Sequence, residues 1–267
     1  MKDLIDDGFG YDPTTREPFD PIVVRGAPTV PVRAAVDPTL LPPVGQQGTD
    51  RAPGSPGSCA AWSSVYGLAT FAAARAGKVD PASATGCASP AEIFVQALQL
   101  EGATSATCAG SRFGSYFALL AAGTPALSSA PYEPNCAWLW NQYCTAPVPP
   151  DSRFTLTGVA CVATDDLDSI KQVIAAGGPM AYGTRLYTDW TAYHGEPSPY
   201  VGNGTLMYGR NGRPAGHCML IIGYDDDLGA VRVQNSQGVA WGSEGYVWMA
   251  YDTFQALAQG QAFFVAG

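Results

Sequence analysis

Gly57-Ser58-Cys59-Ala60-Ala61-Trp62-Ser63-Ser64 is the stretch that decides the fold, because a loop ends in it and a long apolar helix begins. The residues before it, 52–58, are rich in Gly, Pro and Ser, a composition typical of a loop. After the cysteine, alanines dominate and no Pro interrupts the run. We expect a helix over residues 59–76, ended by Gly77, and its scarcity of polar side chains indicates that it is buried.

Cys59 at the first position of this helix is a candidate nucleophile. The N-terminus of a helix is the positive end of its dipole, which favours the thiolate, and the thiolate is the reactive form of cysteine. The alternative is a structural cysteine, since free cysteine is among the most buried residue types. The choice between them depends on groups elsewhere in the chain.

The overall composition bounds the class of protein. The chain has 267 residues, 46% of them hydrophobic, enough for one large domain or two small ones with a sizeable core. The net charge of -9 argues against nucleic acids and anionic membrane surfaces as partners. No apolar run is long enough for a transmembrane helix, and residues 1–7 are acidic rather than the apolar segment of a secretory signal. We expect a monomer that needs no cofactor.

The chain contains seven cysteines, so six remain if Cys59 is a nucleophile. Cys136 and Cys144 bracket a short aromatic stretch and could form a disulfide, and Cys87 with Cys108 is a second candidate pair. The alternative is that all six are reduced. A disulfide favours a secreted or periplasmic location over a cytoplasmic one. The sequence has no Cys-x-x-Cys motif and only two histidines, so the cysteine spacing fits no common zinc-binding pattern.

Residues 1–40 differ from the rest of the chain. They are rich in Pro, Asp and Val and show no sustained period, which is typical of an extended arm rather than a core element. Such an arm can be a docking strap, a flexible lead-in or a short pro-segment. Residues 41–267 then form the main domain, with a helical half at about 41–150 and a β half at about 151–267.

The helical half is expected to contain two helices after the central one. Ser89 is a good N-cap, Pro90 suits the first helical position, and Glu92 completes a capping box. Residues 111–122 form the third helix, and residues 124–150 are expected to be a loop.

The second half changes to strand patterns. Strands are expected at residues 154–162, 179–186, 218–224, 230–235, 245–250 and 261–265, with a helix at 164–176. The turn at residues 225–229 joins two of these strands as a hairpin. A long loop at residues 188–216 carries His194. The fold class is therefore α+β, with a helical half followed by a mostly antiparallel β half.

A thiolate nucleophile needs an imidazole to accept and return a proton, and the imidazole needs a third group that fixes its tautomer. His194 lies in a Gly/Pro-rich loop, whereas His217 stands at the entry to a nearly all-apolar strand. Asn235 ends the partner strand, so the hairpin brings it near His217, where its amide can accept a hydrogen bond from the ring. The alternatives are a structural histidine at a strand end and an asparagine that forms a turn.

These motifs, taken together, resemble those of the papain family of cysteine peptidases. The matching residues are Gln47-Gly48, Gly57-Ser58-Cys59 with Trp62-Ser63, Gly216-His217 with Gly223-Tyr224, and Asn235-Ser236 with Trp241-Gly242 and Gly245-Tyr246. Each motif alone is weak, but their order and separations over roughly residues 40–255 are those of the family.

The resemblance implies a papain-like α+β fold with a cleft between a helical left half and a β-rich right half. It assigns Cys59 as the nucleophile and His217 as the general base. Asn235 then orients the imidazole, and Gln47 helps to form the oxyanion hole. The implied activity is that of a cysteine endopeptidase that cleaves polypeptides through a thioester acyl-enzyme, in a compact bacterial-type relative whose arm is a short inhibitory segment.

Two other functions remain open. One is a non-catalytic papain-like binding module. The other is a relative that transfers the acyl group to another acceptor, as a transpeptidase or deamidase does.

The chain departs from the family's pattern at several positions. The family has Trp directly after the cysteine and after Asn-Ser, where this chain has Ala60 and Gln237. The second of these Trp residues shields the Asn–His hydrogen bond from water in the family. An insertion around residues 50–53 lengthens the segment between the glutamine and the nucleophile, so Gln46 is an alternative to Gln47 as the oxyanion donor.

Overall fold

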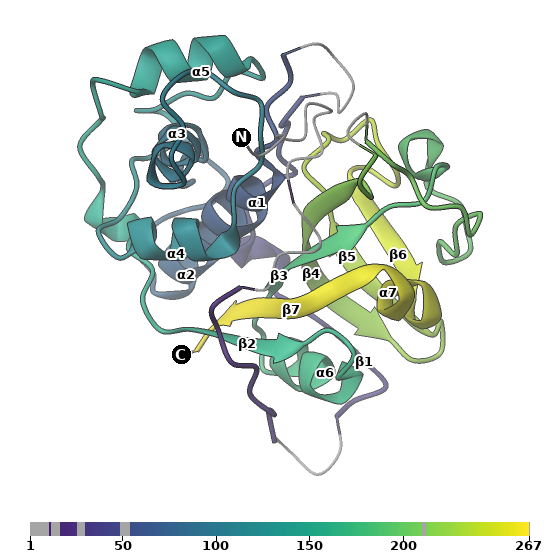
Figure 1. The fold of residues 1–267 in the computed structure, drawn as a ribbon. Helices are drawn as coiled ribbons and strands as arrows, with labels where there is room; N and C mark the ends of the chain where they lie inside the picture. The colour runs from purple at the N-terminus through teal and green to yellow at the C-terminus, as the bar shows by residue number, and fades with distance from the viewer. Residues whose placement is uncertain (1–10, 12–16, 26–29, 49–53, 210–211, 267) are drawn as a thin grey trace.

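The computed structural model describes residues 11, 17–25, 30–48, 54–209 and 212–266 (Figure 1). The helical segments are η1 (Pro38–Leu40), α1 (Cys59–Ala61), η2 (Trp62–Ala69), α2 (Thr70–Arg75), α3 (Ala91–Leu100), α4 (Phe113–Leu120), α5 (Cys136–Tyr143), η3 (Ser152–Phe154), α6 (Leu167–Ala175), η4 (Trp190–Ala192) and α7 (Tyr251–Leu257). The strands are β1 (Arg33–Ala35), β2 (Val159–Ala163), β3 (Met180–Arg185), β4 (Gly216–Asp225), β5 (Ala230–Gln234), β6 (Tyr246–Ala250) and β7 (Ala258–Val265).

The strands form an antiparallel sheet that lies beside a group of helices (Figure 1). The strand order is β2-β7-β3-β4-β5-β6, and β1 pairs with the C-terminal end of β4. Helices α2 to α5 gather on one side of the molecule, and α1 lies between them and β4 (Figure 1). A helical half therefore precedes a β half, as the sequence predicts.

Three consecutive segments, α1, η2 and α2, form the central helix. All residues of α1 and η2 are buried. Gly67 faces β4, where a Cβ atom would lie 3.3 Å from the methyl carbons of Leu220, so the helix and the sheet pack closely. Gly77 follows the helix with a φ of 68°, a conformation that favours glycine. The predicted helix is confirmed over residues 59–75, and it is buried apart from the half-buried Ala72 and the exposed Arg75.

The predicted capping box at the start of α3 is wrong, because Pro90 is the N-cap and Ala91 the first helical residue. The Ser89 hydroxyl does accept a hydrogen bond from the Ala91 N–H, at 3.1 Å. Glu92, however, turns away from the N-cap and accepts from Gln96 Nε2 at 2.6 Å and from the Val148 N–H at 3.1 Å. A tertiary contact with a distant loop thus replaces the local one.

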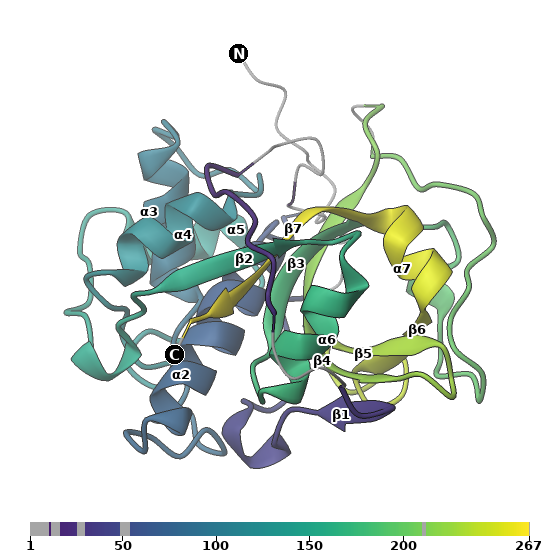
Figure 2. The same ribbon diagram turned by 90° about the horizontal axis from the view of Figure 1, so that it is seen from below.

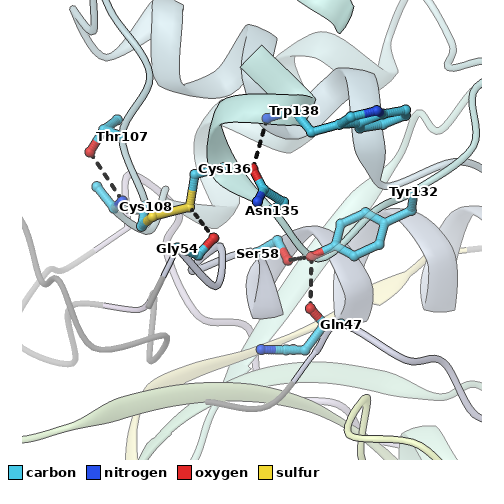
Figure 3. Close-up of a disulfide and its surroundings, with 10 residues drawn as sticks. Gln47, Gly54, Ser58, Thr107, Cys108, Tyr132, Asn135, Cys136 and Trp138 are labelled. Carbon is cyan, nitrogen blue, oxygen red and sulfur yellow. Dashed lines mark hydrogen bonds between the residues drawn. A yellow bond between two sulfur atoms is a disulfide. The ribbon is translucent and has the colours of Figure 1, made fainter. Parts of the chain in front are cut away.

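The predicted loop at residues 124–150 contains a helix, α5. The Asn135 side chain caps it by accepting from the Trp138 N–H at 2.9 Å, so the aromatic stretch is helical (Figure 3). Both candidate disulfide pairs are also wrong, because Cys136 is bonded to Cys108. Cys87 and Cys144 are thiols. Pairing depends on which elements pack together, and α5 lies against the segment that precedes α4.

In the β half, the predicted strands are present in the predicted order, but some of them begin at other residues. The first strand begins at Val159 rather than at residue 154, and the last begins earlier than expected, at Ala258. Helix α7 was not predicted, since a segment of 7 residues is too short to show a clear helical period. Helix α6 is capped by Asp166, which accepts from the Ser169 N–H at 3.0 Å.

The described part of residues 1–40 lies along the body of the protein (Figure 2). The Phe19 ring packs against Phe117 and Phe263, with centroids 5.7 and 5.4 Å away. The Ile22 N–H donates to the Cys161 carbonyl of β2 at 2.8 Å. None of the helices in the described ranges has the length and apolarity that a membrane span requires.

Candidate active site

Cys59 begins the central helix and is fully buried, with a thiol that is not in a disulfide. The loop that leads to it is held at two points. The Gly57 N–H donates to the Cys108 carbonyl and the Cys136 N–H donates to the Gly54 carbonyl, each at 2.9 Å. Because Cys108 and Cys136 are joined by the disulfide, a covalent link ties together the two segments that hold this loop (Figure 3).

His217 and Asn235 are joined by a hydrogen bond in the β half. Nε2 of His217 lies 2.7 Å from Oδ1 of Asn235. Both side chains are buried, with 0% and 2% of their surface exposed. The predicted contact between these residues is therefore present, whereas His194 is exposed in the segment after η4.

The β4–β5 hairpin explains how these two side chains meet. Leu220 of β4 pairs with Gln234, the last residue of β5, and the register shifts between Ile221 and Gly223. Asn235 follows β5 directly and continues toward the start of β4, where His217 lies. On its other side His217 pairs with Thr184 of β3, so the histidine lies in the interior of the sheet.

The start of the central helix meets the His217 end of β4. Cys218, the next residue, is fully buried, and its thiol is in hydrogen-bond contact with that of Cys59. Burial above all, together with this contact, raises the pKa of Cys218 well above its ordinary value, so Cys218 is a neutral thiol. The start of the central helix, which carries Cys59, therefore lies against β4 at the residue next to His217.

Gln47 lies beside the same segment. Its Oε1 accepts from the Ser236 hydroxyl at 2.6 Å, and its N–H donates to the Ser236 carbonyl at 2.7 Å. Since the carbonyl end of the amide is engaged by Ser236, Nε2 is the end that can donate to a ligand. Gln46 instead pairs its backbone with Gln237 and turns its amide toward Gly238.

Tyr132 links the glutamine segment to the nucleophile segment (Figure 3). Its hydroxyl donates to the Gln47 carbonyl at 3.0 Å and lies 2.7 Å from the Ser58 hydroxyl. The Trp62 ring packs edge-on against Tyr132, with centroids 5.0 Å apart, and also covers Gly45, which has no room for a side chain. The tryptophan of the central helix thus fixes the chain just before Gln47.

The supporting roles of Tyr132 and Ser236 were not predicted from the sequence. Ser236 stands in the Asn235-Ser236 motif, but a hydroxyl in a loop gives no sequence signal of the partner it binds. The insertion around residues 50–53 lies outside the described residues. Among the described residues no group of three or more His, Cys, Asp or Glu side chains could hold a metal ion.

Residues 50–264 match the family model described as papain family cysteine protease. The chain is a member of the papain family of cysteine proteases. No curated protein matches the sequence of this protease.

Solved structures of other cysteine proteases share the fold. Xylellain, a cysteine protease from Xylella fastidiosa, has a TM-score of 0.72 and 21% identity, with 100% of this chain and 99% of that chain covered. Digestive procathepsin L2 proteinase from the Tenebrio molitor larval midgut has a TM-score of 0.67 and 21% identity, with 98% and 80% covered. The Carica candamarcensis protease CMS1MS2, solved with E-64, has a TM-score of 0.58 and 18% identity, with 89% and 100% covered. The papain-like α+β fold is confirmed.

Proposed function

We propose that this protease is an endopeptidase that hydrolyses peptide bonds, with Cys59 as nucleophile and His217 as general base and acid. The observation that carries the proposal is the 2.7 Å contact between Nε2 of His217 and Oδ1 of Asn235. An amide oxygen can only accept, so Nε2 carries a hydrogen. Nδ1 is then the ring nitrogen that exchanges a proton with the thiol.

The reaction follows from these roles. The Cys59 thiolate attacks the carbonyl carbon of the scissile bond, and the carbonyl oxygen becomes negatively charged. The Cys59 N–H and Nε2 of Gln47 donate to this oxygen. His217 gives its proton to the leaving amine, and a thioester remains. A water molecule, deprotonated by His217, attacks the thioester, releases the new carboxylic acid and restores the thiol.

The second candidate is a non-catalytic binding module, which the substitutions Ala60 and Gln237 favour. The hydrogen bond between His217 and Asn235 argues against it, because a module has no need of an oriented imidazole. Acyl transfer to an amine uses the same thioester and differs only in the acceptor.

Labelling of the thiol separates these functions. We expect an epoxide that alkylates nucleophilic thiols to label the full chain and the control Cys144→Ser, and to leave Cys59→Ala unlabelled. Labelling of His217→Ala should be slower by roughly a thousand-fold or more, and hydrolysis of a fluorogenic peptide should follow the same order. If the folded chain neither labels nor hydrolyses peptide with or without its arm, it is a binding module. Mass analysis of products with added amine distinguishes hydrolysis from transfer.

Residues 1–40 act as an inhibitory arm in this proposal, and two contacts support that role. Glu17 is 2% exposed, and its carboxylate accepts from the N–H groups of Phe113 at 2.8 Å and Gly114 at 3.0 Å, at the start of α4. Tyr11 is buried against Gly183, which has no room for a side chain and pairs with Cys218, the neighbour of His217.

Loosening the arm should raise activity. We expect Glu17→Ala to cleave peptide faster than the full chain, and a chain that starts near Val36 to be faster still. Asp20→Ala, an exposed acid in the same arm, is the matched control and should behave like the full chain. Equal activity of all four proteins would show that the arm does not inhibit.

A further inference from the structure

Gln237 occupies the position at which the papain family has tryptophan. Its Oε1 accepts a hydrogen bond from Nδ2 of Asn235 at 3.3 Å. At the other end of the same amide, Oδ1 of Asn235 accepts from the Ser236 N–H at 2.8 Å and lies 2.7 Å from Nε2 of His217. Each end of the Asn235 amide therefore meets a group of opposite polarity.

An asparagine amide has nearly the same shape in its two flipped orientations, so shape alone does not fix it. In the flipped orientation Nδ2 would point at the N–H of the His217 ring, and two donors would face each other. An acceptor beside Nδ2 makes this flip unfavourable. Gln237 supplies that acceptor through its Oε1.

The backbone of Gln237 is itself fixed. It forms an antiparallel bridge with Gln46, and the next residue, Gly238, donates its N–H to the Gly45 carbonyl at 2.9 Å. Gly238 has a φ of 78° and no room for a side chain, because the Gln46 amide lies against it. The root of the Gln237 side chain is thus held by the same segment that carries Gln47.

The nitrogen end of the Gln237 amide indicates that hydrogen bonding to water does not determine the orientation of this side chain. Its Nε2 is buried and has no hydrogen-bond partner among the described residues. A solvated loop glutamine would turn this group to water, because burying an unpaired donor costs free energy. The orientation of the Gln237 side chain is therefore explained by the hydrogen bond that its Oε1 accepts from Nδ2 of Asn235.

We propose that Gln237 is a positioning residue that acts through Asn235: its amide oxygen fixes the Asn235 amide so that Oδ1 faces the His217 imidazole. In this chain a polar acceptor maintains the Asn–His hydrogen bond by orienting the asparagine, whereas the family's tryptophan maintains it by shielding it from water. The proposal rests on the proposed function, since the imidazole matters only if His217 exchanges protons.

Two substitutions of similar length separate the acceptor from the shape of the side chain. Gln237→Met removes the acceptor, and we expect kcat to fall roughly fivefold while KM changes less than about twofold. The basic limb of the kcat/KM pH profile should move to lower pH, because a poorly held imidazolium loses its proton more easily. Gln237→Glu keeps an acceptor oxygen and should retain kcat, and its charge should move the basic limb to higher pH.

The outcomes that overturn the proposal are specific. One is a Gln237→Met protein with the kcat and pH profile of the full chain. Another is an equal loss in Gln237→Met and Gln237→Glu, which would indicate that shape matters and not the acceptor. A change in KM alone would indicate contact with substrate. Gln237→Leu, which also lacks an acceptor, replaces Gln237→Met if that variant does not fold.

An NMR measurement keeps the test independent of activity. The chain has two histidines, so the Nε2–H proton of His217 can be assigned with a His194→Gln variant. We expect this proton to exchange slowly with water in the full chain and in Gln237→Glu, and faster in Gln237→Met. If the full chain shows no hydrolysis but these differences appear, the proposed function fails and the positioning role stands. If it hydrolyses peptide and the three proteins exchange alike, the positioning role alone fails.

Discussion

The segment that carries Cys59 and the segment that carries Asn235 are both buried, but different interactions hold them. The loop before Cys59 is braced by the Cys108–Cys136 disulfide, and the helix after it is packed into the apolar core. Asn235 follows a strand and is held by hydrogen bonds to His217, Ser236 and Gln237.

The difference has a physical consequence. Apolar packing is weakly directional, and a disulfide joins two segments without contacting the reacting groups, whereas hydrogen bonds fix the orientation of an amide or a ring. Changes on the Cys59 side are therefore expected to lower the free energy of unfolding more than kcat. Changes on the Asn235 side are expected to lower kcat more than stability.

Removing the disulfide should have the largest effect. The bond closes a sequence separation of 28 residues, and we expect Cys108→Ser/Cys136→Ser to lose roughly 3–4 kcal/mol of unfolding free energy. Chemical denaturation measures this, with Cys144→Ser as the control that removes a thiol outside the disulfide. A double variant as stable as the control would show that the disulfide does not stabilise the Cys59 side.

Asn235→Ala tests the other side. We expect kcat/KM to fall on the order of a hundred-fold, about 2.7 kcal/mol of barrier, because the imidazole loses the group that orients it. Peptide hydrolysis measures the fall, and the unfolding midpoint should change less than in the disulfide variant. Asn141→Ala, an exposed asparagine on α5, is the control. Full activity of Asn235→Ala would show that the hydrogen bond between His217 and Asn235 is not needed for hydrolysis.

Ser236→Ala should have a smaller effect on the same side. The hydroxyl orients Gln47, so its loss is expected to lower kcat roughly tenfold, less than the loss of the oxyanion donor itself. Ser236→Thr keeps the hydroxyl and should retain most of the activity. In a double-mutant cycle, Ser236→Ala should cost little when Gln47→Ala is already present. Additive losses would contradict a role through Gln47.

The pH dependence of the arm is the smallest effect. Burial raises the pKa of Glu17, although the Gly114 and Phe113 N–H groups and the Arg112 charge lower it; Glu101 raises it further. The docked arm therefore binds a proton more tightly than the free arm. Its docking is strongest below the ordinary pKa of glutamate and weakens as pH rises through the raised value.

Comparison with a variant that cannot titrate isolates this effect. Across that pH range, the activity of the full chain divided by that of Glu17→Gln should rise with pH. The ratio removes the pH dependence that belongs to Cys59 and His217. A ratio that stays constant would show that Glu17 does not couple the arm to pH.

Local patterns predicted much of the fold. The helix from Cys59 is specified by its own alanines and by Gly77, and the β4–β5 hairpin by its turn at residues 225–229. The hairpin also predicted that Asn235 meets His217, because strand register fixes which residues lie across from each other. Helix α5 was missed, since its aromatic residues suit several structures equally well.

The sequence by itself determined the types of chemical group, their order and the local elements that carry them. Only the tertiary structure decided which cysteine bonds to Cys108, that Glu92 binds Val148 rather than its own helix start, and that Ser236 and Tyr132 hold Gln47. These partners lie far apart in the chain. Their pairing depends on how helices and strands pack as whole bodies, and a local pattern of residues carries no information about that.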